Sequence, residues 1–144
     1  MDKSLRNATT SDLQMVLELL EAVKRPTAGV KDQIQNFVLE FENQTLLACA
    51  GLEIHGQAGL LRSVAVNAAE RSHGIAARLV KSILEHARTQ GLLSIFLLTE
   101  SAEHYFLRFG FAQVSRAEIP TSLHTSEELR GACPDSAVVM MLML

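Results

Sequence analysis

The sequence predicts an α/β fold with a sheet of mixed direction, and three observations lead to this class. Alternating apolar residues at 37–43 and 45–55 indicate two antiparallel strands joined by a short turn. The run LLSIFLLTE at 92–100 is almost continuously apolar, which is typical of a strand covered on both faces. A strongly amphipathic helix at 75–90 separates it from the strand LLRSVAV at 60–66, so these two strands are expected to be parallel neighbours.

The first part of the chain predicts a strand followed by two helices. Residues 3–9 form the expected strand, and Ser11 and Gln14 have the spacing of a capping box that opens a helix. Pro26 and Gly29 end this helix. Its apolar stripe consists of Leu13, Val16, Leu17 and Leu20. A short second helix over 30–37 leads into the hairpin.

The helix at 75–90 has the clearest periodicity in the chain, and Gly91 ends it. A turn at Gly56–Gly59 precedes the strand at 60–66, and the chain closes with a helix at 101–110 and strands at 111–119 and 136–144. One helix face carries Ile75, Leu79, Val80, Ile83, Leu84 and Ala87, and the other carries Arg78, Lys81, Glu85 and Arg88.

The composition is that of one globular domain, and it argues against several classes of function. The 144 residues are 48% hydrophobic and 20% charged, which fits a single domain over residues 1–144 without a disordered segment. The net charge is −3 and there is no basic block, so we expect no nucleic-acid partner.

Targeting and redox signals favour a cytoplasmic protein. The N-terminus, MDKSLRNATT, lacks the apolar segment of a secretory signal, and the longest apolar run, at 137–144, is too short to cross a bilayer. Cys49 and Cys133 form no CxxC motif, which fits reduced thiols. The histidines show no metal-ligand spacing, so we expect no metal site. The Met-rich end belongs in a core or an interface, and at a sheet edge it would favour a homodimer.

The segment that follows the strand at 60–66 has the composition of an anion-binding loop. It reads Arg71-Ser72-His73-Gly74-Ile75-Ala76 and directly precedes the helix at 75–90. The first N–H groups of a helix lack intrahelical partners and carry partial positive charge, which suits a phosphate. The loop lies where the antiparallel and parallel parts of the sheet meet, a common ligand site. The alternative is a loop of solvated charges around a helix-starting glycine. The P-loop and dinucleotide fingerprints are both missing.

Two stretches, VAVNAAERSHGIAARLVKSILEHA and FLLTESAEHYFLRFGF, resemble the acetyl-CoA-dependent N-acetyltransferase (GNAT) superfamily, and the resemblance covers essentially the whole chain. It implies a GNAT-like fold: a mixed six- or seven-stranded sheet with helices on both faces and splayed central parallel strands. It also implies that residues 71–76 bind the pyrophosphate of acetyl-CoA. The backbone of Val64 and Val66 would pair with the pantetheine arm, and Thr99 stands where the family often has an asparagine.

A narrower likeness concerns the stretches LLRSVAV, FLLTESAEHYFLRFGF and CPDSAVVM. Together they resemble the small N-acetyltransferases associated with arsenic-resistance operons. That resemblance implies a small amine substrate, amino-acid-like in character, without identifying it.

The catalytic residues depart from the family pattern. The tyrosine that many members use as general acid is replaced by Phe106, and the tyrosine lies one residue earlier, at Tyr105. A shift of one residue on a helix rotates a side chain by about 100°, so Tyr105 is not expected to take the same place. Glu100, at the open end of the strand at 92–100, is the candidate base, and its alternative role is that of an acidic residue favoured at a helix start.

Arg62 is the candidate ligand for the substrate. A cation within LLRSVAV must form a pair or face a cleft, so it either holds a substrate carboxylate or makes an internal salt bridge. Strand alternation places Ser63 on the opposite face from Arg62. It also places Glu53 and His55 together, on the solvent face of the hairpin or in the site.

The sequence as a whole therefore predicts an enzyme that transfers an acetyl group from acetyl-CoA to the amine of a small molecule by direct attack in a ternary complex. Two alternatives stay open. One is a catalytically weak module that binds acetyl-CoA and acts as a regulator, because the usual tyrosine is displaced. The other is a protein N-acetyltransferase.

Overall fold

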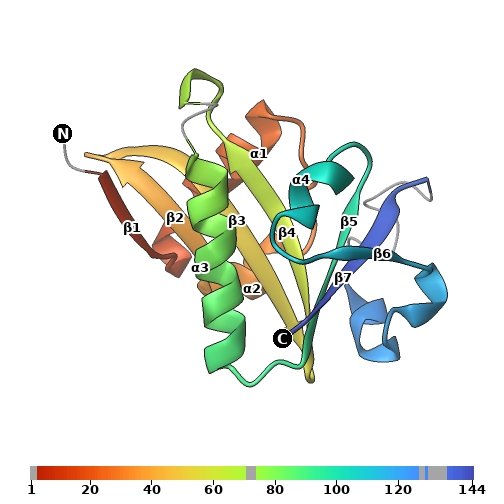
Figure 1. Ribbon diagram of the computed structural model, residues 1–144. Helices are drawn as coiled ribbons and strands as arrows, with labels where there is room; N and C mark the ends of the chain where they lie inside the picture. Colours follow the sequence, from red (N-terminus) through yellow and green to blue (C-terminus); the bar gives the residue numbers. More distant parts are fainter. Residues whose placement is uncertain (1–2, 71–73, 127–128, 130–135) are drawn as a thin grey trace.

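Seven strands form one sheet in the order β1-β2-β3-β4-β5-β7-β6 within the part of the chain that the computed structural model describes, residues 3–70, 74–126, 129 and 136–144 (Figure 1). The strands are β1 (Lys3–Asn7), β2 (Phe37–Glu42), β3 (Thr45–His55), β4 (Ala58–Val66), β5 (Ser94–Thr99), β6 (Ala112–Val114) and β7 (Val138–Met143). The helices are α1 (Leu13–Ala22), α2 (Val30–Gln33), α3 (Ile75–Thr89) and α4 (Glu103–Leu107). Short 3-10 helices are η1 (Thr10–Asp12), η2 (Ile34–Asn36), η3 (Ala68–Glu70), η4 (Arg116–Glu118) and η5 (Thr121–Thr125).

The sheet is mixed and covered on both faces, as predicted. Strands β1 to β4 are antiparallel neighbours, β4 and β5 are parallel, and β7 is antiparallel to both β5 and β6. Helices α3 and α4 contribute to one apolar core, and α1 and α2 contribute to a second core on the opposite face (Figure 1). Helix α3 buries all six residues of the predicted stripe, which confirms the periodicity read from the sequence.

The parallel pairing of β4 with β5 is short. It joins Ala58 to Ser94 and ends at Leu60 opposite Phe96, although both strands continue beyond these residues. The strands therefore diverge toward their C-terminal ends, which confirms the splay that the family resemblance implies. In Figure 1, α4 lies close to the gap that this divergence leaves.

A β-bulge interrupts β4 at the point where it leaves β5. Cys49 pairs with Ala65 and Gly51 pairs with Arg62, so two residues of β4, Ser63 and Val64, lie opposite Ala50 alone. Ser63 has a φ of 58°, in the left-handed region that non-glycine residues rarely adopt. The prediction that Ser63 and Arg62 point to opposite faces is wrong, because the bulge breaks the alternation and Arg62 Nε donates to Ser63 Oγ at 2.9 Å.

Several boundaries differ from the predicted ones. Helix α4 covers 103–107 rather than 101–110, and β6 covers only 112–114, because Ser115 and Glu118 form a capping box that starts η4. The first capping box joins Thr9 and Asp12 rather than Ser11 and Gln14. The Met-rich strand β7 lies between β5 and β6, so the edge position that would favour a homodimer is not the one it occupies.

Asp12 fastens the start of α1 to β1. Its carboxylate accepts hydrogen bonds from Arg6 Nη1 at 2.8 Å, from Arg6 Nη2 at 2.9 Å and from the Thr9 N–H at 2.8 Å. These bonds, with that of Arg6 foremost, hold the pKa of this carboxyl far below its usual range.

We expect Asp12 to stabilise the fold above about pH 4, where it is ionised in both folded and unfolded chains. As the pH falls below that value, the unfolded chain takes up a proton that the folded chain resists, so this stabilisation is lost. Asp12→Asn should cost about 1 kcal/mol of unfolding free energy at neutral pH, because it removes the charge that pairs with Arg6, and it should flatten the acid dependence. Urea unfolding from pH 3 to pH 7 measures both. The exposed Glu21→Gln is the control, and equal acid slopes for Asp12→Asn and the wild type would contradict the assignment.

Candidate functional site

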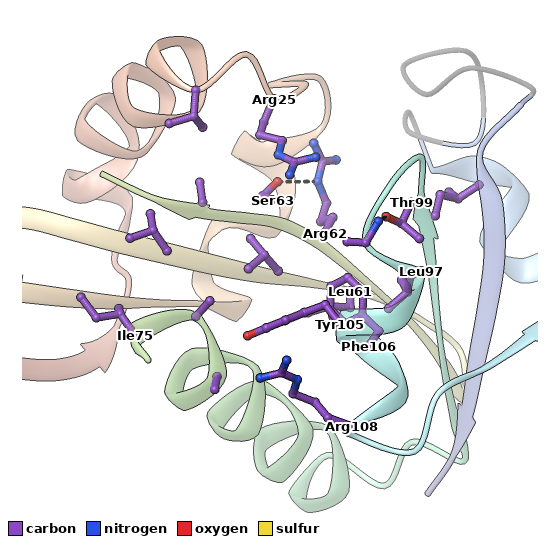
Figure 2. Close-up of a pocket in the computed structure, with 18 of the residues that line it drawn as sticks. Arg25, Leu61, Arg62, Ser63, Ile75, Leu97, Thr99, Tyr105, Phe106 and Arg108 are labelled. Atoms are coloured by element: carbon purple, nitrogen blue, oxygen red, sulfur yellow. Dashed lines mark hydrogen bonds between the residues drawn. The ribbon is translucent and has the colours of Figure 1, made fainter. Parts of the chain in front are cut away.

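A pocket of about 680 Å³ opens where β4 and β5 diverge (Figure 2). Two strands, the first turn of a helix and a helix–helix connection supply its walls. The lining includes residues 61–66 of β4, 74–77 at the start of α3, 97–99 of β5, Tyr105, Phe106 and Arg108 near α4, and Arg25 and Pro26 between α1 and α2. The predicted site residues Arg62, Val64, Val66, Gly74, Ile75, Ala76, Thr99 and Tyr105 all lie in this wall.

The start of α3 forms one end of the pocket and has the features of an anion site. Gly74 precedes the helix with a φ of 72°, and a Cβ there would meet nothing closer than Arg78 Nη1 at 4.0 Å. Ala76 and Ala77 leave the first turn without bulk. The first-turn N–H groups lack intrahelical partners and carry partial positive charge, so an anion at this end of the pocket would be stabilised. The predicted residues Arg71, Ser72 and His73 lie outside the described residues.

The edge of β4 forms the floor of the pocket. Beyond Leu60 this strand has no pairing with β5 among the described residues, and Val64 and Val66 are half-buried where they line the cavity. A strand edge without a partner strand offers backbone N–H and C=O groups to an extended ligand. The divergence of the two strands thus creates both the space and the hydrogen-bonding groups.

Helix α4 brings two neighbouring aromatic residues to the pocket. Phe106 is buried, whereas Tyr105 is half-buried and its hydroxyl extends into the cavity (Figure 2). The Arg108 guanidinium lies over the Tyr105 ring at 4.4 Å from the centroid, and Phe106 and Phe109 contact the ring edge-on. The shift of one residue from the family position therefore does not remove the phenol from the pocket. Burial raises the pKa of Tyr105, and the charge of Arg108 partly offsets this rise.

Arg62 is buried at the opposite end of the pocket and makes an internal ion pair. Its Nη1 donates to Glu53 Oε2 at 2.7 Å, and the exposed fractions of the two side chains are 0% and 3%. Of the two roles considered for Arg62, the internal salt bridge is present. The solvent-face alternative for Glu53 is wrong, because its carboxylate is buried against Arg62 and Ser126.

Glu53 and Arg62 also hold segments that are distant in the sequence. Arg62 donates to the carbonyl oxygen of Ala28 at 2.6 Å and to that of Pro26 at 3.2 Å. Glu53 accepts a hydrogen bond from Ser126 Oγ at 3.1 Å and lies 2.9 Å from His55 Nε2. The pair thereby connects β3 and β4 to the α1–α2 connection and to the residue after η5.

Arg25 is a pocket residue that the sequence analysis missed. It lies on the α1–α2 connection and is exposed, and its guanidinium has no hydrogen bond or acidic partner among the described residues. Figure 2 shows the guanidinium groups of Arg25 and Arg62 at the same end of the pocket. Nothing in the local sequence separates Arg25 from the other exposed cations, because only the contacts with Arg62 bring its segment to the site.

Two predicted residues near the end of β5 have different places. Thr99 lines the pocket, and its Oγ1 accepts a hydrogen bond from the Ala102 N–H at 2.9 Å, which fixes the turn into α4. Glu100 is exposed and does not line the pocket.

Within the described part of the chain, no three His, Cys, Asp or Glu side chains are grouped as metal ligands. No described helix has the length and apolarity needed to cross a membrane.

The fold and the pocket together define an α/β domain with a cavity between two diverging parallel strands. The chain belongs to the acetyltransferase (GNAT) family, whose model matches residues 7–111.

Curated relatives and solved structures agree with this assignment. An amino-acid acetyltransferase of Ectopseudomonas mendocina is 30% identical over 129 residues, which are 83% of this chain and 30% of the relative. One from Salmonella arizonae is 29% identical, with 83% of this chain and 29% of the relative covered. The chain thus spans less than a third of the length of these relatives.

Two solved structures share the fold. N-acetylglutamate synthase from Neisseria gonorrhoeae, complexed with coenzyme A and N-acetyl-glutamate, superposes with a TM-score of 0.83 at 22% identity over 100% of this chain and 35% of that chain. The PaiA N-acetyltransferase from Thermoplasma acidophilum, in complex with coenzyme A, has a TM-score of 0.75 at 15% identity over 100% of both chains.

The ionisation of Tyr105 can be measured directly, because it is the only tyrosine in a chain without tryptophan. We expect its tyrosinate absorbance to rise with a midpoint above the ordinary value of about 10, since partial burial disfavours the phenolate. Arg108→Met should raise the midpoint further, because it removes the nearby positive charge, whereas the distant Arg88→Met should not. A midpoint at the ordinary value in the folded protein would show that the phenol is solvated.

Proposed function

We propose that the protein is an acetyl-CoA-dependent N-acetyltransferase that acetylates the amine of a small, amino-acid-like molecule. The observation that carries this proposal is the pocket between the diverging strands β4 and β5, with the start of α3 at one end and arginine side chains at the other. Membership of the family and the activity named for the curated relatives support it.

The pocket fits acetyl-CoA in the distribution of its polar groups. The first turn of α3, from Gly74 to Ala77, would hold the pyrophosphate, with the predicted Arg71, Ser72 and His73 beside it. The edge of β4 at Val64 and Val66 would hold the pantetheine arm through backbone groups. The cavity of about 680 Å³ has the size of a small-molecule site. When bound, acetyl-CoA supplies an activated acetyl thioester.

The arginine end of the pocket would bind the acceptor. Arg62 is paired with Glu53, whereas Arg25 brings a positive charge that no described acidic residue neutralises. A carboxylate on the acceptor would neutralise this charge and accept charge-assisted hydrogen bonds from the Arg25 guanidinium. An amino acid or a close analogue carries such a carboxylate next to its amine.

The residues around the centre of the pocket would assist the transfer. A backbone N–H near Val64 would donate to the acetyl oxygen. Tyr105 keeps its proton through the neutral range, so its hydroxyl can donate to the leaving sulfur. Glu100 stays the candidate base, and it would act through water because its side chain does not line the pocket. A cytoplasmic location, a homodimer and the lack of a nucleic-acid partner stay predictions, and the likeness to the arsenic-resistance-associated enzymes stays a resemblance.

The anion site is tested with two glycines at opposite ends of one helix. Gly74 and Gly91 have φ values of 72° and 78°, and neither would place a Cβ within 3.9 Å of another atom. Both Gly74→Glu and Gly91→Glu therefore introduce the same charge and similar backbone strain. We expect only Gly74→Glu to weaken acetyl-CoA binding in titration calorimetry, by at least roughly tenfold, because its carboxylate would face the phosphates. Equal binding by both variants, or none by the wild type, would contradict the proposed cofactor site.

The role of Tyr105 distinguishes an enzyme from a binding module. Tyr105→Phe keeps the ring contacts but removes the proton, so kcat for thiol release with an amino-acid acceptor should fall on the order of 10²-fold, while acetyl-CoA affinity is unchanged. Thiol release is followed with a chromogenic disulfide. Unchanged kcat would exclude the phenol as the acid. Tight acetyl-CoA binding by the wild type without thiol release from any amine would favour the regulatory alternative.

A further inference from the structure

We propose that Glu53 is a positioning residue: through Arg62 it holds the α1–α2 connection at the acceptor end of the pocket and thereby sets the affinity for the acceptor. The part that concerns the acceptor rests on the proposed function. The part that concerns the position of the connection rests on the contacts of Glu53 and Arg62 alone.

The Glu53 carboxylate is buried and has a polar partner on each of its two oxygens. It is 2% exposed, and its carboxylate receives the Arg62 guanidinium at 2.7 Å and the hydroxyl of Ser126 at 3.1 Å, both on Oε2. Its other oxygen, Oε1, lies 2.9 Å from His55 Nε2. Ser126 is itself 1% exposed. A buried carboxylate with partners on both oxygens has little rotational freedom, so it orients the guanidinium that it pairs with.

Arg62 transmits this orientation to the wall of the pocket. While Nη1 binds Glu53, the same guanidinium donates to the carbonyl oxygens of Ala28 and Pro26, which lie 34 and 36 residues away in the chain. Pro26 and its neighbour Arg25 line the pocket. A rotated guanidinium would lose these two carbonyl bonds, and the segment that carries Arg25 would no longer be held against β4.

The negative charge of Glu53 is needed in addition to its hydrogen bonds. Arg25 and Arg62 bring two positive charges to one end of the pocket (Figure 2). With Glu53 ionised, Arg62 is neutralised within the fold and the charge of Arg25 is available to an anionic acceptor. Without the negative charge of Glu53, Arg25 and Arg62 would repel each other, and this repulsion would drive the α1–α2 connection away from β4.

The test compares Glu53→Gln with Glu40→Gln. Glu40 is a second buried glutamate, 3% exposed, and its Oε2 pairs with Arg78 Nη2 at 2.8 Å. It serves as the control because the bonds between Glu40 and Arg78 do not involve the α1–α2 connection. Hydrogen exchange is measured on the full chain in the absence of any ligand. We expect residues 24–30 to exchange faster in Glu53→Gln only, while α3 keeps its protection in that variant. Unchanged exchange of residues 24–30 in a folded Glu53→Gln protein would overturn the proposal.

The kinetic arm measures the acceptor directly. For Glu53→Gln we expect the KM for an amino-acid acceptor to rise roughly tenfold, the equivalent of about one charge-assisted hydrogen bond, with kcat and acetyl-CoA affinity nearly unchanged. Losses that fall equally on kcat and on cofactor affinity would indicate a general structural defect and overturn the proposal.

If Glu53→Gln does not fold, a milder substitution tests the same proposal. Ser126→Ala removes one donor to Glu53 Oε2 and should shift exchange and acceptor KM in the same direction by a smaller factor, and no shift in either would overturn the proposal. A wild-type protein that transfers no acetyl group would overturn the proposed function. The exchange of residues 24–30 would still decide whether Glu53 holds the connection.

Discussion

The early end of the parallel pairing between β4 and β5 is the constraint on which the rest of the site depends. Only the first part of β4 pairs with β5, and a bulge at Ser63 then turns the strand away. Because strands in a continuous sheet leave no space between them, a pocket within the sheet requires such a break. The break leaves backbone groups of β4 without a partner strand, and it opens a path from the start of α3 to Arg62. The proposed cofactor end and the proposed acceptor end of the pocket therefore share one structural origin.

The same break imposes an electrostatic requirement. Arg62 lies just before the bulge, with no exposed side-chain surface, and an isolated buried cation would be strongly destabilising. Glu53 on β3 supplies the compensating charge, and the carbonyl groups of Pro26 and Ala28 satisfy further donors. Arg62 must be neutralised for the chain to fold, and the same bonds that satisfy it also attach the α1–α2 connection to β4.

Sequence periodicity was sufficient for the parts of the molecule in which neighbours along the chain decide the structure. The buried face of α3, the hairpin of β2 and β3, and the parallel pair of β4 and β5 follow from regular spacing of apolar residues. The errors occur where regularity fails. The face of Ser63 was misjudged because strict alternation was assumed through a bulge that only the pairing with β3 reveals. The burial of Glu53 was not foreseen because Ser126, which contacts its carboxylate, lies 73 positions away in the chain. Arg25 was missed because its segment reaches the pocket through the bonds of Pro26 and Ala28 with Arg62, which lies 36 and 34 positions away, and no local pattern records such contacts.

The two ends of the pocket are built from different parts of the chain, and this difference bears on specificity. Backbone groups of β4 and α3 form the proposed cofactor end, and they persist whenever the fold does. The proposed acceptor end is formed by the side chains of Arg25 and Arg62, on separate elements, and Glu53 is bonded to Arg62. One substitution there can change its charge or shape. Proteins at 15–22% identity share this fold with TM-scores of 0.75–0.83. This likeness shows the fold alone, so the cofactor and the acceptor must both be argued from this chain's own residues.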